Sequence, residues 1–312
     1  MGKIAFIFPG QASQYSGMGK EVHDQFPEAA RIFKKADEIL GFPLTEMCFS
    51  GSEDDLKLTE NTQPAILTVS VAVLKAFQKN GFQPHYVAGH SLGEYSALVA
   101  AGALSFEDAV QAVRNRGRYM QEAVPVGVGA MAAILEANLE AVTEICDTVR
   151  DGLVLSAANI NCPGQIVIAG HAEVVEKAIV QAKKMGFRRA VRLPVSAPFH
   201  CELMRPAQEK LKKDLLELTF RDLSVPLVNN VDAQLVTQGE EARDGLIRQV
   251  TGSVLWQQSV EKLVACGVDT FLEIGPKRVL CGMVRKVAPD ARVFAVERLE
   301  EIAEAAQAFK AV

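Results

Sequence analysis

The chain has 312 residues, of which 49% are hydrophobic and 23% are charged, and its formal net charge is −5. It can therefore bury a sizeable core, as one large domain or two smaller ones. The negative charge and the lack of a polybasic block argue against binding to nucleic acid or to a membrane surface, and no apolar stretch is long enough to span a bilayer.

The six cysteines are scattered along the chain without a Cys-x-x-Cys pair. In a chain of this length they are expected to be reduced, with no metal site and no cofactor. The apolar run near the N-terminus lacks a small-residue cleavage site, so we interpret it as a core strand rather than a signal peptide. We therefore expect a cytoplasmic protein, and we expect it to be a monomer.

The predicted elements alternate between strands and helices. In the first part of the chain, a buried strand is predicted at 3–8 and a short strand at 86–88. Helices are predicted at 19–40, 63–79, 95–103 and 105–123. The last of these helices begins with Ser105-x-x-Asp108, a capping box in which Asp replaces the usual Glu or Gln.

Residues 125–197 follow a different pattern. It predicts strands at 129–135, 153–159, 165–169 and 189–195, and helices at 138–150 and 172–186. The order β-α-β-β-α-β is that of a ferredoxin-like fold, and Asn161-Cys162-Pro163-Gly164 has the composition of a turn. We therefore expect a ferredoxin-like subdomain at 125–197, inserted into a larger α/β core formed by 1–124 and 198–312.

The chain after this segment returns to the pattern of the core. Helices are predicted at 202–217, 240–250 and 254–265, and strands at 226–229, 270–274 and 293–296. A further helix is predicted between the last two strands, and another at the C-terminus.

The Gly-x-Ser-x-Gly pattern of residues 89–93 lies between a strand-like run and a helix-forming run. A sharp turn in that context can expose the hydroxyl of Ser91 as a nucleophile. The glycines leave room for the turn, and the N–H groups of the next helix point to where an oxyanion would form. An ordinary glycine-rich turn with a serine N-cap is the simpler alternative, and the strand–helix context favours the nucleophile.

A serine nucleophile needs a base, and the chain has five histidines. His90 is a poor candidate, because adjacent side chains on a tight turn usually point apart. His200 lies in the loop after the inserted segment, 109 residues (200 − 91) beyond the serine, and it is only modestly favoured over His171. No acidic partner for the base is evident, although Asp232 and Asp269 are conceivable, and a backbone carbonyl could orient the imidazole instead.

Arg116 lies on the apolar face of the helix predicted at 105–123, together with Ala109, Val113 and Met120. A buried guanidinium needs a carboxylate partner, from the protein or from a ligand. A structural salt bridge, or a side chain that extends past the core, is the alternative, and the helix alone does not decide between them.

Several short motifs follow one another in a fixed order. They are Phe8-Pro9-Gly10-Gln11, Asn61-Thr62-Gln63-Pro64-Ala65, Gly89-His90-Ser91-Leu92-Gly93-Glu94, Arg116-Gly117, Phe199-His200, Val228-Asn229-Asn230 and Glu273-Ile274-Gly275-Pro276. With this ordered set the chain closely resembles the malonyl-CoA:acyl carrier protein transacylases of bacterial fatty acid synthesis, over nearly its whole length. The resemblance implies an α/β-hydrolase-like core with an inserted ferredoxin-like subdomain, and an active site in the cleft between them.

The resemblance also implies catalytic roles. Ser91 would be the nucleophile and His200 its base, with the imidazole oriented by backbone carbonyls that include that of Gln249. The backbone N–H groups of Gln11 and Leu92 would hold the oxyanion.

For the substrate, the resemblance implies that Arg116 binds the malonyl carboxylate. Phe199 would favour malonyl over methylmalonyl, because a bulky ring narrows the space for an α-methyl branch. Gln63 and His90 are further substrate-binding residues in this comparison.

The implied activity is transfer of the malonyl group from malonyl-CoA to the phosphopantetheine thiol of acyl carrier protein, through a malonyl-serine intermediate. The alternatives are a serine thioesterase or hydrolase, an acyltransferase that serves a polyketide synthase, and a noncatalytic module that binds carrier protein. Because carrier proteins are acidic, basic residues are expected to dock them; the candidates are Lys183, Lys184, Arg188, Arg189, Lys277, Arg278, Arg285 and Lys286.

Two positions depart from the family pattern. Ala12 and Lys277 stand where the family commonly has glycine. We expect Ala12 to tighten the oxyanion loop slightly and Lys277 to be peripheral.

Overall fold

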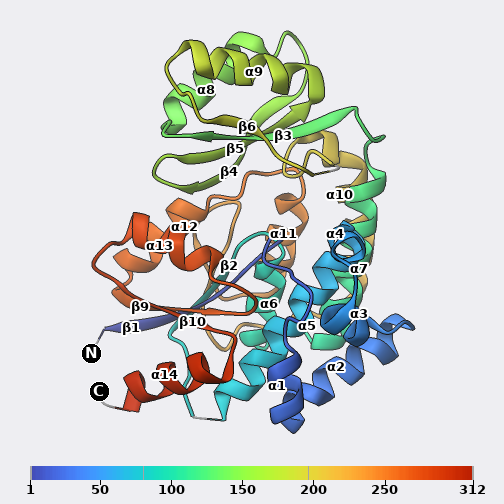
Figure 1. The fold of residues 1–312 in the computed structure, drawn as a ribbon, viewed down its shortest axis with the longest axis vertical. Coiled ribbons are helices and arrows are strands. Elements are labelled where there is room, and N and C mark those ends of the chain that lie inside the picture. Colours follow the sequence, from blue (N-terminus) through green and yellow to red (C-terminus); the bar gives the residue numbers. More distant parts are fainter. Residues whose placement is uncertain (1, 80, 196, 311–312) are drawn as a thin grey trace.

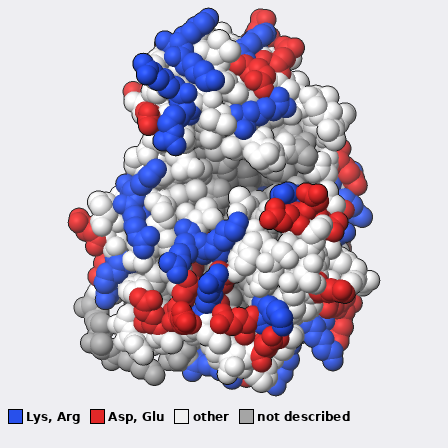
Figure 2. Space-filling view, in the orientation of Figure 1, with Lys and Arg blue, Asp and Glu red and all other residues white. Residues whose placement is uncertain are grey.

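A computed structural model describes residues 2–79, 81–195 and 197–310, which form two β-sheets surrounded by helices (Figure 1). Five residues of the predicted segments lie outside the described residues: 1 and 80 in the segment 1–124, 196 in the segment 125–197, and 311–312 in the segment 198–312. Figure 2 shows that the surface is hollowed between the part that contains the smaller sheet, at the top, and the part that contains the larger one. Among the helices of the described ranges, none is long and apolar enough to cross a membrane.

The N-terminal part of the chain supplies two strands of the larger sheet and the helices on one side of it. Its elements are β1 (Lys3–Phe8), α1 (Lys20–Gln25), α2 (Pro27–Leu40), α3 (Leu44–Ser50), α4 (Glu53–Lys57), α5 (Thr59–Gln78), β2 (Tyr86–Gly89), α6 (Gly93–Ala100) and α7 (Phe106–Glu122).

The predicted single helix at 19–40 is wrong in one respect, because the chain breaks between α1 and α2. Pro27 occupies the first turn of α2, and Phe26 before it is extended, with φ −118° and ψ 113°. The residue before a proline is disfavoured in helical conformation, so the break follows from the sequence. The short helices α3 and α4 were not predicted.

Helix α5 begins at Thr59, four residues before the predicted start, and contains Pro64. A proline inside a helix cannot donate to the carbonyl four residues earlier, which here belongs to Glu60. That carbonyl accepts a hydrogen bond from Arg114 Nη1 at 2.8 Å instead. The side chain of a neighbouring helix therefore replaces the missing bond, and α5 continues through the proline.

The middle of the chain forms the smaller sheet. Its elements are β3 (Gly129–Leu135), α8 (Leu139–Val149), β4 (Leu155–Cys162), β5 (Gln165–His171), α9 (Ala172–Lys184) and β6 (Ala190–Arg192). The strands are antiparallel in the order β4-β5-β3-β6, and both helices lie on the same side of the sheet in Figure 1. The element order agrees with the prediction, but β6 is shorter, and β4 extends through Asn161 and Cys162, which leaves Pro163-Gly164 as the turn.

The C-terminal part returns to the larger sheet. It contains a short 3-10 helix η1 (Glu202–Met204), α10 (Arg205–Glu217), β7 (Leu227–Val228), β8 (Leu235–Val236), α11 (Gly239–Gln249), α12 (Trp256–Ala265), β9 (Val268–Ile274), α13 (Val279–Val287), β10 (Arg292–Val296) and α14 (Leu299–Lys310). Strand β8, which was not predicted, pairs with β7 in antiparallel orientation.

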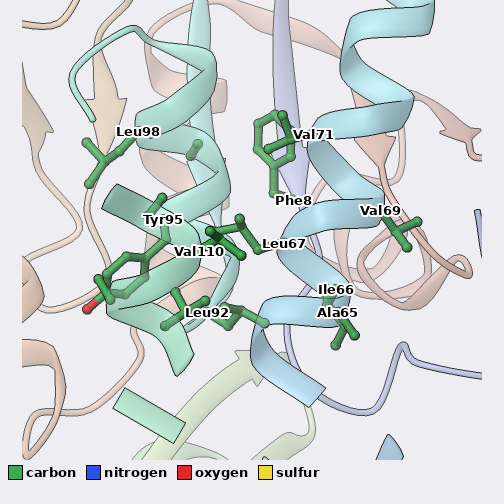
Figure 3. Close-up of a cluster of buried hydrophobic side chains, with 14 of the residues drawn as sticks. Phe8, Ala65, Ile66, Leu67, Val69, Val71, Leu92, Tyr95, Leu98 and Val110 are labelled. Carbon is green, nitrogen blue, oxygen red and sulfur yellow. The ribbon is translucent and has the colours of Figure 1, made fainter. Parts of the chain in front are cut away.

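The larger sheet has the order β10-β9-β1-β2-β7-β8, and its first five strands are parallel. Strand β1 is buried on both faces: Ala5 and Ile7 pack with α12 and α13, whereas Phe6 and Phe8 pack with α5 and α6. Figure 3 shows part of the second cluster, to which β1, α5, α6 and α7 contribute. Because β1 and β2 are central and parallel, the loops that follow them leave the same edge of the sheet side by side.

Candidate active site

Ser91 lies on the sharp turn between β2 and α6, as the sequence predicts. Its backbone is left-handed, with φ 52°, which is strained for a serine. A Cβ atom on Gly89 would lie 2.0 Å from the Gly93 carbonyl, and a Cβ atom on Gly93 would lie 2.0 Å from the Phe8 oxygen. Only glycine therefore fits at either position, and the turn brings Ser91 to the carboxyl edge of the larger sheet.

His200 is the histidine that contacts this serine. Its Nε2 lies 2.7 Å from Ser91 Oγ, and its Nδ1 lies 2.8 Å from the main-chain oxygen of Gln249. A carbonyl oxygen accepts only from an N–H group, so Nδ1 carries a proton and Nε2 is free to accept from the serine. Asp232 is bound by Arg248, and Asp269 contacts Thr270, so neither is the acidic partner.

The other histidines lie elsewhere. Nε2 of His90 is 2.8 Å from Asn161 Oδ1, in β4, and its ring meets Trp256 edge-on at 5.7 Å between ring centroids. His171, the alternative base, accepts a hydrogen bond from the backbone of Val154 in the smaller sheet. His90 therefore connects the turn at Ser91 to the smaller sheet instead of acting on the serine.

Arg116 is buried, with 1% of its surface exposed, and its guanidinium reaches the serine from α7. Nη1 donates to Gln63 Oε1 at 2.8 Å, and Nη2 donates to Ser91 Oγ at 3.0 Å and to Gln249 Oε1 at 2.9 Å. Nε is buried without a hydrogen-bond partner. All its hydrogen-bond partners within the described ranges are neutral, and the carboxyl of Glu94 acts on its charge without a hydrogen bond to it. A carboxylate that binds the guanidinium directly is therefore left for a ligand to supply.

The side chain of Gln249 holds several of these groups together. Its Nε2 lies 3.1 Å from the Ser91 carbonyl oxygen and 3.0 Å from Glu94 Oε2. This arrangement fixes the orientation of the amide, because Nε2 must face the acceptors while Oε1 faces Arg116.

Asn230 supports the turn itself, and sequence reasoning gave it no role. Its Oδ1 accepts from the backbone N–H of Ser91 at 2.7 Å, and its Nδ2 donates to the Gly89 carbonyl at 2.7 Å. Its own N–H donates to Glu94 Oε2 at 2.9 Å. The only signals for these contacts were the place of Glu94 and Asn230 in two of the ordered motifs.

The two expected oxyanion donors lie in the loops that follow β1 and β2. Among the hydrogen bonds of the described residues, none uses the backbone N–H of Gln11 or of Leu92. The side chain of Gln11 accepts from Gln63 Nε2 at 3.3 Å, and Gln63 in turn accepts from Arg116. Both N–H groups are therefore free to bind a ligand, and one of the loops is connected to the guanidinium through Gln63.

Burial changes the pKa values of this site. Burial, followed by the charge of Arg116, lowers the pKa of His200 to about 3. Burial raises the pKa of Glu94 to about 7, against the hydrogen bonds from Asn230 and Gln249. Burial also lowers the pKa of His90. His200 is thus neutral at neutral pH, as a general base must be.

A model of the acyl transferase domain matches residues 5–301. The chain is 51% identical, over 311 residues, to a malonyl CoA-acyl carrier protein transacylase of Bacillus subtilis (strain 168), with 99% of this chain and 98% of the relative covered. The chain belongs to the malonyl CoA-acyl carrier protein transacylase family of acyl transferases. Among solved structures, an acyl carrier protein S-malonyltransferase of Vibrio cholerae is similar, with 42% identity, a TM-score of 0.95, and coverage of 97% of this chain and 99% of that one. A malonyl-transacylase in complex with a type II PKS acyl-carrier protein matches with 41% identity, a TM-score of 0.96, and coverage of 98% of this chain and 99% of that one.

The two departures from the transacylase family's glycines lie in contact with each other. Ala12 and Lys277 both have left-handed backbones, with φ 79° and φ 64°, which glycine would adopt without strain. Nζ of Lys277 donates to the Ala12 carbonyl at 3.2 Å, and its backbone N–H donates to Glu297 Oε2 at 3.0 Å. The expectation that Lys277 is peripheral is therefore wrong, because it contacts the loop that carries Gln11.

Proposed function

We propose that this protein transfers the malonyl group from malonyl-CoA to the phosphopantetheine thiol of acyl carrier protein, through a malonyl-serine ester, in fatty acid synthesis. The observation that carries the proposal is the position of Arg116. A buried guanidinium without a carboxylate partner lies 3.0 Å from the oxygen of a serine that also contacts a neutral histidine. An acyl group with a carboxylate two bonds from its carbonyl carbon suits that pair of groups.

In the first half-reaction, His200 Nε2 takes the proton of Ser91 Oγ as the oxygen attacks the thioester carbonyl carbon. The tetrahedral oxyanion is held by the N–H groups of Gln11 and Leu92, a contribution of about 3–4 kcal/mol for each donor. The oxyanion collapses, the C–S bond breaks, and CoA leaves with the proton held by His200. The Gln249 carbonyl stabilises the imidazolium through the Nδ1 proton.

In the second half-reaction, the carrier protein's thiol attacks the malonyl-serine ester and gives its proton to His200. The tetrahedral intermediate forms in the same oxyanion site. When it collapses, the Ser91 oxygen leaves and takes the proton back. Arg116 holds the malonyl carboxylate throughout, which fixes the ester in a pose suited to the thiol and less suited to water.

Three further residues shape the acyl site in this proposal. The ring of Phe199, which is 7% exposed, limits the space beside His200 and disfavours an α-methyl branch. Gln63 orients Arg116 by accepting from Nη1. His90 binds substrate from the side of the smaller sheet.

The proposal extends to domain organisation. Residues 1–124 and 198–312 would form an α/β-hydrolase-like core, and residues 125–197 a ferredoxin-like subdomain, in a monomeric cytoplasmic protein. The strand order β4-β5-β3-β6 and the five parallel strands of the larger sheet support this division. The main-chain bonds of Val254 with Ala158 and Ile160 join the two parts, so the subdomain forms one wall of the cleft.

Carrier protein would dock on the basic face. Figure 2 shows that Lys and Arg side chains gather over α9 and α13, on both sides of the hollow. The candidate residues there are exposed: Lys183, Lys184, Arg188, Arg189, Lys277, Arg278, Arg285 and Lys286. Association with carrier protein should therefore slow as salt is added, and an association rate independent of salt contradicts this docking surface.

The test of the proposed function is covalent labelling of the serine. After brief incubation with malonyl-CoA, peptide mass analysis should find one malonyl group on Ser91, and Ser91→Ala should remain unlabelled. A noncatalytic carrier-binding module would show no label. A thioesterase would release malonate without a lasting label. Equal discharge to carrier proteins of fatty acid and polyketide synthesis would leave the polyketide role as an equal candidate.

A further inference from the structure

The hydrogen bonds of Arg116 leave one of its nitrogens, Nε, without a partner and engage the oxygen of Ser91. Nη2 has two N–H groups, and both are occupied, by Ser91 Oγ and by Gln249 Oε1. Nε is buried and unpartnered, although it shares one edge of the guanidinium with Nη2. In the unloaded protein the guanidinium thus donates to Ser91 Oγ itself. Of the two nitrogens, Nε and Nη2, whose parallel N–H groups would fit a carboxylate, Nε is free and Nη2 is occupied.

A carboxylate that binds this edge must take Nη2 away from one of its two partners. Gln249 is held at the other end of its amide by Glu94 and by the Ser91 carbonyl, so it cannot withdraw easily. Ser91 Oγ is the atom at which the acyl group arrives, and it becomes an ester oxygen after transfer. The bond that a substrate carboxylate replaces is therefore the one between Arg116 and Ser91 Oγ.

We propose that Arg116 restrains the Ser91 hydroxyl in the unloaded protein, and that the carboxylate of the incoming acyl group releases it by taking over the guanidinium. This inference rests on the proposed function. Beyond it, the inference states that the acyl group is selected through the reactivity of Ser91 as well as through binding. A neutral acyl group, such as acetyl, leaves the restraint in place.

The charge of Arg116 also weakens His200 as a base in the unloaded protein. The guanidinium of Arg116, on α7, and the ring of His90, after β2, both lower the pKa of His200, whereas the carbonyl groups of Gln249 and Gly252 raise it. Burial has the largest effect. A carboxylate on Arg116 would cancel its charge, so His200 would become a stronger base when a carboxylate-bearing substrate is bound.

The test divides the substrate into two pieces. Acetyl-CoA supplies the neutral acyl group, formate supplies the carboxylate, and quenched-flow mass analysis measures acetyl-Ser91. The acetyl carbon moves from the CoA sulfur to Oγ, and CoA leaves with the proton of the serine. Formate should accelerate acetylation about tenfold over chloride at equal ionic strength, which corresponds to loss of one charge-assisted hydrogen bond. With malonyl-CoA, formate should inhibit.

Arg116→Gln is the matched variant, with Arg116→Ala as a second in case the first folds poorly. Both should acetylate faster than the wild type, and formate should not accelerate either. An Arg116 variant that acetylates no faster than the wild type, with no formate effect in the wild type, overturns the inference. The proposed function is judged separately, by labelling of the wild-type protein with malonyl-CoA. If Ser91 of the wild type is labelled, the proposed function stands even though the inference fails; if it is not labelled, the proposed function fails as well.

A readout other than activity is the imidazole of His200 in protein with ¹³C-labelled histidine, its signal identified by its loss in His200→Ala. Formate should raise its pKa in the wild type and leave it unchanged in Arg116→Gln. An unchanged pKa in the wild type at a formate concentration that inhibits malonyl transfer contradicts the proposed release.

Discussion

The main-chain oxygen of Gln249 lies 2.8 Å from Nδ1 of His200, where many serine enzymes have a carboxylate. A carbonyl oxygen fixes the same tautomer without adding a charge to the buried site. Because the acceptor is a main-chain atom, the side chain of Gln249 is free to hold Arg116. One residue therefore positions both His200 and Arg116, through different atoms.

Gln249→Ala should separate these two roles. The variant keeps the bond to His200 but removes the acceptor that anchors Arg116, so kcat/KM for malonyl transfer should fall about tenfold or more while acetyl transfer falls less. Steady-state kinetics with both acyl-CoA donors checks this. Gln257→Ala, at a half-buried position of α12 whose amide donates to Glu261, is the control. Equal losses for the two acyl groups would count against an anchoring role.

The positions of Ser91 and Arg116 can be predicted from the sequence, because the signals for them are local. The glycines around Ser91 allow a turn that no other residue fits, and Arg116 interrupts an apolar helix face. The loop position of His200 favours it only modestly over His171, and the ordered motifs decide between them, since contact across 109 residues depends on the fold.

Contacts between residues far apart in the chain could not be predicted from local sequence patterns. Asn230 and Glu94 hold the turn from positions 136 residues apart, and nothing in their own neighbourhoods indicates the contact. Strand β8, which was not predicted, has two residues, too few for an alternating pattern to appear. In α5, the missing bond at Pro64 is replaced by Arg114 from another helix, so the early start of that helix could not be inferred from its own residues.

Phe199→Ser should relax selection against a branched acyl group. Removing the ring opens space beside His200, so kcat/KM for methylmalonyl-CoA relative to malonyl-CoA should rise about tenfold or more, the usual effect of one methyl group in a pocket. The free energy of unfolding should fall by about 3–5 kcal/mol, because Phe199 is buried. Phe199→Leu, which keeps more of the bulk, should give a smaller change in the ratio. An unchanged ratio in the serine variant would rule out Phe199 as the size filter.

Glu94 makes stability depend on pH. Burial raises its pKa from 4.5 to about 7, so between these values the folded protein binds more protons than the unfolded chain. The proton on Glu94 therefore contributes fully to the free energy of unfolding below pH 4.5. As pH rises through 7 this contribution is lost, and the free energy of unfolding falls by up to about 3 kcal/mol. Glu94→Gln keeps an acceptor for Asn230 and Gln249 but cannot ionise, so its stability relative to the wild type should increase from pH 5 to pH 8.

Denaturant unfolding at several pH values measures this difference. Glu217→Gln, at an exposed position of α10, serves as the control. A constant difference between Glu94→Gln and the wild type would mean that Glu94 titrates alike in the folded and unfolded chains.

Ala12→Gly should stabilise the protein. The left-handed backbone of Ala12, with φ 79°, costs about 1 kcal/mol for any residue with a Cβ atom, and glycine avoids most of that cost. We expect a gain of about 0.5–1 kcal/mol in the free energy of unfolding. Ala303→Gly, at an exposed position inside α14, removes the same methyl group from a helix and should lose about 1 kcal/mol. Losses at both positions would mean that Ala12 is not strained.

The central claim is that Ser91 carries malonyl between two thiols while water is kept from the ester. Intact-mass analysis of the protein after malonyl-CoA, followed by addition of carrier protein or of buffer alone, tests it most directly. We expect one malonyl group per chain, which persists in buffer and is lost within one turnover when carrier protein is added. In Arg116→Ala the malonyl group should persist less well in buffer. A mass that does not increase, or an acyl group lost to buffer as fast as to carrier protein, would contradict it.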